Sequence, residues 1–288
     1  MAAARRAGFR LDVADELPDE FIEKVRAAVK RVSPEKFLLG EVWEDATTKF
    51  GFNKRRTYLL GKGLDSVMNY PFKNAVLDFV KGKPAEQAMT EILTICEHYP
   101  APAMDTALNF LSTHDTERAL TVIADEPANG RGRAWQSGRC VTGDAYEEGL
   151  LRLRMAYAII YTLPGVPCLY YGDEIAMQGY RDPFNRAFFR WDAHEQRLRP
   201  VLAQLAQLRH TCEAFRTGQL RVLRAEDGIL HYQRVGKVET AEIIINRTEH
   251  IIVETLASGK STEVNPMGFT IVVEEVGHNP NHSYYDYV

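Results

Sequence analysis

The stretch YEEGLLRLRMAYAIIYTLPGVPCLYYGD, residues 146–173, contains one complete repeating unit of the fold. Its first part, Tyr146–Thr162, is strongly apolar and is predicted to be a helix. Its second part, Val166–Asp173, is predicted to be a strand in which apolar and polar residues do not alternate. Such a strand is buried on both faces, as in a parallel sheet covered by helices. The stretch therefore predicts an α/β fold.

The same strand–helix order extends toward the N-terminus and is repeated five times in all. The other predicted strands are Gly8–Val13, Phe37–Val42, Leu64–Tyr70 and Ala107–Ser112. The other predicted helices are Pro18–Val32, 71–80, Ala85–His98, Thr116–Ala124 and Glu195–Thr211. An open sheet that binds dinucleotides would carry GxGxxG after its first strand, and this motif is absent. The pattern favours part of a closed (β/α)8 TIM barrel, with about five of its strand–helix units.

The texture of the sequence changes at about Phe215. Five short apolar runs separated by turns follow, and they predict a small antiparallel β-sandwich domain. We therefore predict two domains, the C-terminal part of a (β/α)8 barrel at residues 1–213 and an antiparallel β domain at residues 214–288. The last stretch, HNPNHSYYDYV, is polar and aromatic, and is expected to be frayed or packed on a surface.

Composition makes several classes of partner improbable. The chain is 45% hydrophobic with a formal net charge of −4, and its basic residues are dispersed, so nucleic acid is not expected as a partner. No apolar stretch reaches the length of about 20 residues that a membrane span needs. Residues 1–6 are not followed by an apolar run and do not predict a signal peptide. The four cysteines lack metal-ligand spacing and favour a cytoplasmic location.

Acidic residues stand at or near the ends of the predicted strands. Asp12 lies in RLDVADE, Glu41 in LLGEVWE and Asp115 in NFLSTHDTER, while Asp173 and Glu174 close the last strand. Glycoside hydrolysis needs one carboxylate that attacks the anomeric carbon and a second that protonates the leaving oxygen. Acids in these positions also serve as helix caps or structural contacts. For Asp173 and Glu174, a helix cap and a structural contact both stay open.

Four sequence blocks in order resemble the alpha-amylase family of retaining glycoside hydrolases. They are RLDVADE, GEVWE, FLSTHDTER and YTLPGVPCLYYGDEIAMQGYRDPFNRAFFRW, which together extend from about Gly8 to Trp191. The resemblance is strongest to the group of neopullulanases, cyclomaltodextrinases and maltogenic amylases. It implies an α-glucan oligosaccharide or polysaccharide as the substrate, no cofactor, and no metal ligands in this chain. Calcium binding by a complete enzyme stays open.

The resemblance implies a role for each matching residue. Asp12 matches the nucleophile, Glu41 the general acid/base, and Asp115 the third acid, which stabilises the transition state. Arg10 matches the arginine beside the nucleophile and is expected to keep Asp12 ionised. His114 matches a histidine that hydrogen-bonds sugar hydroxyls, although a histidine before an aspartate is often an ordinary loop residue.

Three further residues match sugar-binding positions. Trp43 resembles an aromatic platform for a pyranose ring, and the alternative is core packing of the helix that follows it. Asp182 and Arg186 resemble a pair that binds sugars on the non-reducing side of the cleavage point. For this pair the alternative is a salt bridge across a loop.

The resemblance covers barrel strands four to eight, and no block like DxVxNH is present. We therefore expect open sheet edges around Arg10 and Leu169, covered where possible by a second copy in a homodimer. We expect α-1,4-glucan hydrolysis by a retaining mechanism, with weak or no activity in this chain alone. Two alternatives stay open, a glucanotransferase and a non-catalytic fragment that binds glucan.

Overall fold

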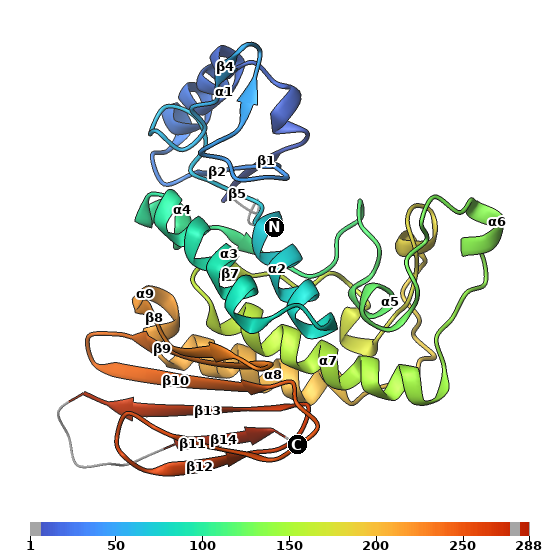
Figure 1. Ribbon diagram of the computed structural model, residues 1–288. Coiled ribbons are helices and arrows are strands. Elements are labelled where there is room, and N and C mark those ends of the chain that lie inside the picture. The colour runs from blue at the N-terminus through green and yellow to red at the C-terminus, as the bar shows by residue number, and fades with distance from the viewer. Residues whose placement is uncertain (1–6, 277–282, 288) are drawn as a thin grey trace, which may run out of the picture.

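The computed structural model describes residues 7–276 and 283–287 (Figure 1). Five short parallel strands follow one another in chain order, which confirms the predicted partial barrel. They are β1 (Gly8–Leu11), β2 (Phe37–Gly40), β5 (Ser66–Val67), β6 (Leu108–Asn109) and β7 (Val166–Pro167). Between β5 and β6 the sheet is continued by a single bridge, Met68 with Leu108. An N-terminal lobe, which contains β1, β2 and β5, meets the rest of the molecule at this bridge and through side-chain contacts such as the 2.6 Å bond from Ser66 Oγ to the Ala103 carbonyl.

Helices alternate with these strands largely as predicted. The longer ones are α1 (Asp19–Val32), α2 (Tyr70–Lys81), α3 (Ala85–His98), α7 (Gly143–Thr162) and α8 (Leu198–Thr211). The shorter ones are α4 (Ala101–Met104), α5 (Ala119–Ala124), α6 (Arg133–Gln136), α9 (Ala214–Thr217), and the 3-10 turns η1 (Ala14–Glu16), η2 (Asp173–Ile175) and η3 (Phe184–Arg186). Helix α2 begins where the Asn69 side chain accepts a hydrogen bond from the Phe72 amide at 3.3 Å, and it ends at Gly82.

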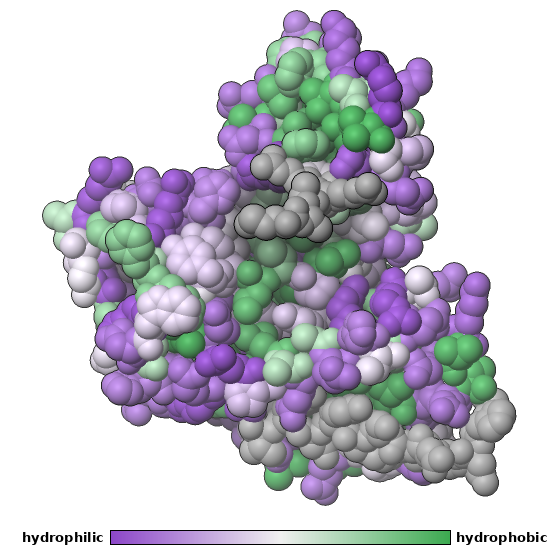
Figure 2. Space-filling model, turned by 180° about the vertical axis from the view of Figure 1, so that it is seen from behind, coloured by the Kyte–Doolittle hydropathy of each residue, from purple (hydrophilic) through white to green (hydrophobic). Residues whose placement is uncertain are grey.

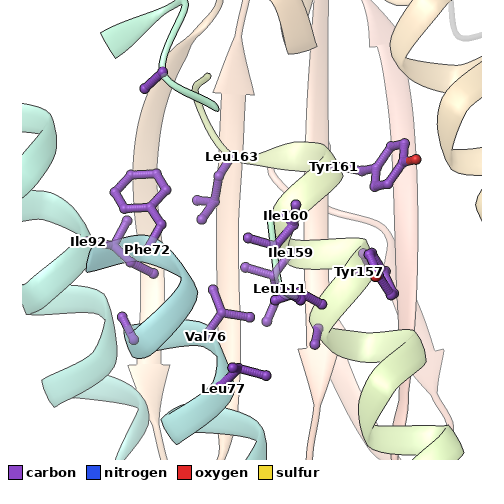
Figure 3. Close-up of a cluster of buried hydrophobic side chains, with 14 of the residues drawn as sticks. Phe72, Val76, Leu77, Ile92, Leu111, Tyr157, Ile159, Ile160, Tyr161 and Leu163 are labelled. Carbon is purple, nitrogen blue, oxygen red and sulfur yellow. The ribbon is translucent and has the colours of Figure 1, made fainter. Parts of the chain in front are cut away.

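The core below the N-terminal lobe is built mainly from α2 and α7. Phe72 and Val76 of α2 point toward Ile159 and Ile160 of α7, and Ile92 of α3 packs on the same cluster (Figure 3). All five side chains are buried. The apolar character of α7 therefore reflects its burial between α2, α8 and the C-terminal sheet.

The C-terminal part is antiparallel, as predicted. Its main sheet has the order β14-β13-β10-β9-β8, and a β11–β12 hairpin covers part of it through a small apolar cluster. The strands are β8 (Gln219–Glu226), β9 (Ile229–Val235), β10 (Glu239–Asn246), β11 (Ile252–Thr255), β12 (Ser261–Val264), β13 (Gly268–Glu275) and β14 (Ser283–Tyr287). The predicted boundary at residues 213 and 214 falls between α8 and β8 and stays a prediction.

Two expectations need correction, and one element was not predicted. The tail forms β14, because its backbone pairs with the edge of β13, while residues 277–282 and 288, like Met1–Arg6, lie outside the described residues. Asp173 begins a 3-10 turn instead of ending a strand. The polar stretch after Trp43 contains a hairpin, β3 (Phe50–Gly51) with β4 (Lys54–Arg55), next to the buried Arg56, whose Nε donates to Asp19 Oδ1 at 2.8 Å.

The two outer parallel strands each have a single neighbour within the described residues. β1 pairs with β2, and β7 pairs with β6. Apolar side chains are exposed on both strands, with Phe9 at 48% and Val166 at 43%. Hydrophobic side chains also gather on the N-terminal lobe and in the hollow below it (Figure 2). The expected open edges are therefore present in the described chain.

Among the described residues, no helix is long and apolar enough to span a membrane.

Candidate active site

Strands β1 and β2 bring Arg10, Asp12 and Glu41 together. Leu11 lies opposite Gly40 in the parallel register, so the residues that follow them, Asp12 and Glu41, leave the sheet side by side. The Arg10 guanidinium pairs with Asp12 through Nη1, and its Nη2 lies 3.1 Å from Glu41 Oε2. One cation thus lies between two carboxylates at the same sheet edge.

The two carboxylates have different surroundings. The Asp12 side chain is 72% exposed, whereas the Glu41 side chain is buried. Glu41 Oε2 accepts a 2.7 Å hydrogen bond from the Val13 amide, and Oε1 accepts one of 3.1 Å from Trp43 Nε1. Val13 has φ 41°, in the left-handed region that β-branched residues rarely adopt. This strained conformation is found where the chain turns its amide toward Glu41.

Trp43 packs on Tyr70, the first residue of α2. The two rings are stacked, with centroids 4.4 Å apart and planes 13° from parallel. The alternative of packing against a following helix is thus realised at the first residue of α2, and a role as a sugar platform stays a prediction. Trp43 is 43% exposed, which leaves aromatic surface available to a ligand.

Tyr70 was not singled out from the sequence, yet it links both halves of the site. Its hydroxyl lies 3.5 Å from Glu41 Oε1, and its ring meets Phe110 edge to face. Burial raises the pKa of Tyr70, and the charges of Glu41 and Asp115 raise it further, so the phenol keeps its proton. The signal in the sequence was its place at the end of a predicted strand, directly before a proline.

The loop after β6 carries His114 and Asp115 and meets the loop around η3. His114 Nε2 lies 2.9 Å from Asp115 Oδ2, and Arg186 Nη2 lies 3.2 Å from Asp115 Oδ1. Arg186 Nε is also 3.2 Å from Asp182 Oδ1. The alternative of a salt bridge between Asp182 and Arg186 is therefore realised, and the same arginine also pairs with Asp115. A role in sugar binding stays a prediction.

Two buried polar residues flank this loop and were not assigned to the site from the sequence. Asn185 belongs to η3, and its side chain is fully buried against the loop. Asp173 accepts a 2.6 Å hydrogen bond from the Tyr157 hydroxyl and lies 3.3 Å from Arg118 Nη1. Burial raises the pKa of Asp173 to about 6. Of the two readings left open for Asp173, the structure shows the structural contact.

The eight residues selected from the sequence thus form two clusters. Arg10, Asp12, Glu41 and Trp43 gather at the ends of β1 and β2, while His114, Asp115, Asp182 and Arg186 gather beyond β6 and β7. Tyr70 lies between them. An exposed carboxylate and a buried one beside a shared cation can supply a nucleophile and a proton donor. In residues 7–276 and 283–287, no group of three or more potential ligand side chains could hold a metal ion.

Comparisons with known proteins point to one enzyme family. The model of the alpha-amylase catalytic-domain family matches residues 6–218. A cyclomaltodextrinase of Geobacillus thermopakistaniensis is 34% identical over 247 residues, and neopullulanase 2 of Thermoactinomyces vulgaris is 30% identical over 264 residues. These matches take in 84% and 88% of this chain.

A solved structure is also similar over nearly the whole chain. It is the ligand-free cyclic α-maltosyl-(1→6)-maltose hydrolase of Arthrobacter globiformis, with a TM-score of 0.78 and 25% sequence identity. The similarity covers 94% of this chain and 56% of that one. For the two curated relatives, the matched share of their own length is 37% and 40%. The chain therefore spans well under half of those relatives.

Proposed function

The chain belongs to the alpha-amylase family, and from this membership we propose that its site cleaves α-1,4-glucosidic bonds with retention of configuration. The proposed substrates are maltooligosaccharides, cyclodextrins, pullulan or starch. The observation that supports the proposal most is the Arg10 guanidinium shared between an exposed Asp12 and a buried Glu41. Such a pair suits a nucleophile and a proton donor that act on one bond.

The reaction we propose has two steps. Asp12 attacks the anomeric carbon while the bond to the leaving sugar breaks, and the leaving oxygen takes a proton from Glu41. Water then attacks the glycosyl ester and gives a proton to Glu41, and Asp12 is released as a carboxylate. Asp115, held by His114 and Arg186, would stabilise the sugar in both transition states.

The neighbours of Glu41 bear on the second step. The Val13 amide, Trp43 Nε1 and the Tyr70 hydroxyl donate hydrogen bonds to it, and Arg10 Nη2 forms an ion pair with it. These contacts hold the carboxyl group in place, and in the second step it takes the proton from water. In the first step the same group gives a proton to the leaving oxygen.

A second candidate function is glucan binding without turnover. The openness of the site favours it, since Asp12 is largely exposed and water reaches the attacking oxygen freely. Exclusion of water strengthens electrostatic stabilisation, and this advantage is reduced in an open site. We therefore propose that this chain alone is weakly active. Transfer to a sugar hydroxyl instead of water would use the same two carboxylates.

We further propose a homodimer in which a second copy covers the exposed edges of β1 and β7. We also propose a cytoplasmic location, which rests on the cysteine pattern.

One experiment tests the catalytic proposal. The chain is incubated with maltoheptaose or β-cyclodextrin, reducing ends are counted, and D12N serves as the control. Release by the wild type alone supports hydrolysis. If calorimetric titration with maltoheptaose gives a heat of binding, but neither protein releases reducing ends, the result supports binding without hydrolysis.

A further inference from the structure

The loop that carries His114 and Asp115 is fixed at both ends by contacts of its own. At the N-terminal end, Ser112 Oγ accepts a 2.8 Å hydrogen bond from the Ala119 amide. At the C-terminal end, the Arg118 amide donates to the Gly179 carbonyl at 2.9 Å, and the Arg118 side chain reaches Asp173. These anchors define where the loop begins and ends, but they leave the orientation of its middle open.

The middle of the loop is held by two side chains of η3: Arg186 Nε donates to the His114 carbonyl at 2.8 Å, and Asn185 makes further contacts of its own. Asn185 Nδ2 donates to the carbonyl oxygens of His114 and Thr116, each at 2.8 Å, and lies 3.3 Å from that of Thr113. Asn185 is fully buried, so water cannot replace these bonds. An amide with two hydrogens shared among three carbonyls constrains their directions relative to one another.

The directions of these carbonyls determine where the site side chains point. The carbonyls of Thr113 and His114 belong to the peptide groups on either side of the His114 α-carbon, and the second of these groups leads into Asp115. Within the loop, the Asp115 amide donates to Thr113 Oγ1 at 3.1 Å, which ties the turn to its own side chains. Asn185 thus fixes the turn against η3, the same element that supplies Arg186 to Asp115.

We propose that Asn185 is a positioning residue, which sets the orientation of Asp115 and His114 toward the sugar without touching it. The role in sugar cleavage rests on the proposed function, whereas the orientation of the loop does not. Because both ends of the loop have other anchors, loss of the amide should loosen the middle of the loop and leave the fold intact.

The sharpest test is the nearly isosteric substitution N185D. The aspartate keeps the shape of asparagine but directs oxygen toward three carbonyl oxygens, so the donor is replaced by an acceptor at the same place. The matched control is N129D, which makes the same chemical change at an exposed asparagine in the loop before α6. N185S is a third variant, uncharged and with a single hydroxyl donor, for the case that N185D does not fold.

Two measurements are made on the full chain. In N185D, kcat on maltoheptaose should fall by about 10-fold to 100-fold with a smaller change in KM, since a misplaced acid mainly costs transition-state stabilisation. Hydrogen exchange at the amides of Thr113 and Asp115 should become faster, while exchange in α2 and α7 should not change. N129D should match the wild type in both measurements, and N185S should lie between the wild type and N185D.

The outcomes separate the two proposals. If the wild type neither binds nor cleaves maltoheptaose, the proposed function fails, and loop exchange alone decides the role of Asn185. If N185D equals N129D in kcat, KM and loop exchange, Asn185 is not a positioning residue, whatever the wild type does. Should N185D fail to fold, wild-type kcat and wild-type loop exchange in N185S would overturn the proposal in the same way.

Discussion

Arg10 Nη2 lies 3.1 Å from Glu41 Oε2, while Nη1 of the same guanidinium pairs with Asp12. The planar fork of arginine can hold two carboxylates at once, which the single ammonium of lysine does less well. The positions of the proposed nucleophile and proton donor are therefore set relative to each other by a third residue, two positions before the nucleophile on the same strand.

Substitution R10Q should disrupt this arrangement. Without the cation the two carboxylates repel each other, so kcat on maltoheptaose should fall by about 100-fold or more, a magnitude typical for loss of one electrostatic partner at a reacting centre. R10K should lie between R10Q and the wild type. Initial rates of reducing-end release measure both. Wild-type rates in R10Q would mean that the shared cation has no part in the reaction.

The variants D12N and E41Q separate the two carboxylates. D12N should lose turnover with an unchanged circular dichroism spectrum, because an amide cannot form the glycosyl ester. E41Q should also be inactive on maltoheptaose, but it should cleave a glucoside with a very good leaving group, which needs no proton. Turnover of maltoheptaose by either variant at the wild-type rate would remove that residue from the mechanism.

Trp43 offers a test of sugar binding. W43A removes the exposed ring face and should weaken maltoheptaose binding by about 2-fold to 12-fold, given that aromatic contacts contribute about 0.5–1.5 kcal/mol. W43F keeps a ring next to Tyr70 but loses the Nε1 bond to Glu41, so affinity should be largely retained while kcat falls. Calorimetric titration gives the affinities. Equal affinity in W43A and the wild type would contradict a platform role.

Asp173 predicts a pH dependence of stability. Burial raises its pKa to about 6, above the ordinary value of 3.8. Between these values the folded chain binds more protons than the unfolded chain, so this residue lowers the free energy of unfolding as pH rises. D173N lacks this effect. The free energy of unfolding of D173N, relative to that of the wild type, should therefore rise by about 2 kcal/mol from pH 4.5 to pH 7. Urea unfolding at both pH values measures it, and a constant difference would refute it.

The exposed edges predict self-association. A dimer that covers β1 and β7 should scatter light with about twice the chain mass of 32.6 kDa. F9K and V166K each place a charge on one of these strands and should shift the mass toward the monomer. L60K, at an exposed leucine between β4 and β5, serves as the control. A wild-type monomer at high concentration would exclude the dimer.

Sequence reasoning located the strand starts well, because an apolar run is a local pattern, and β1, β2 and β7 begin at the predicted residues Gly8, Phe37 and Val166. The predicted strands extend past the observed ends, most at β7, which ends at Pro167 and not at Asp173. Helix α3 has the predicted bounds, Ala85–His98, since Pro84 and Pro100 mark both sides of it. The β3–β4 hairpin was missed because its side-chain contacts are distant in sequence, since Lys54 of β4 pairs with Asp19 and Glu20. Tyr70 was missed for a similar reason, since its contact with Glu41 joins residues 29 positions apart.

The single bridge between Met68 and Leu108 has a consequence for heat inactivation. It divides the proposed catalytic acids, with Asp12 and Glu41 on one side and Asp115 on the other. Side-chain contacts also cross this joint, such as the 2.6 Å bond from Ser66 Oγ to the Ala103 carbonyl, but its backbone pairing is sparse. We therefore expect the joint to open at a lower temperature than the α2–α7 core melts. Catalytic rate should therefore decline on warming several degrees before the helical signal does, and the loss should reverse on cooling.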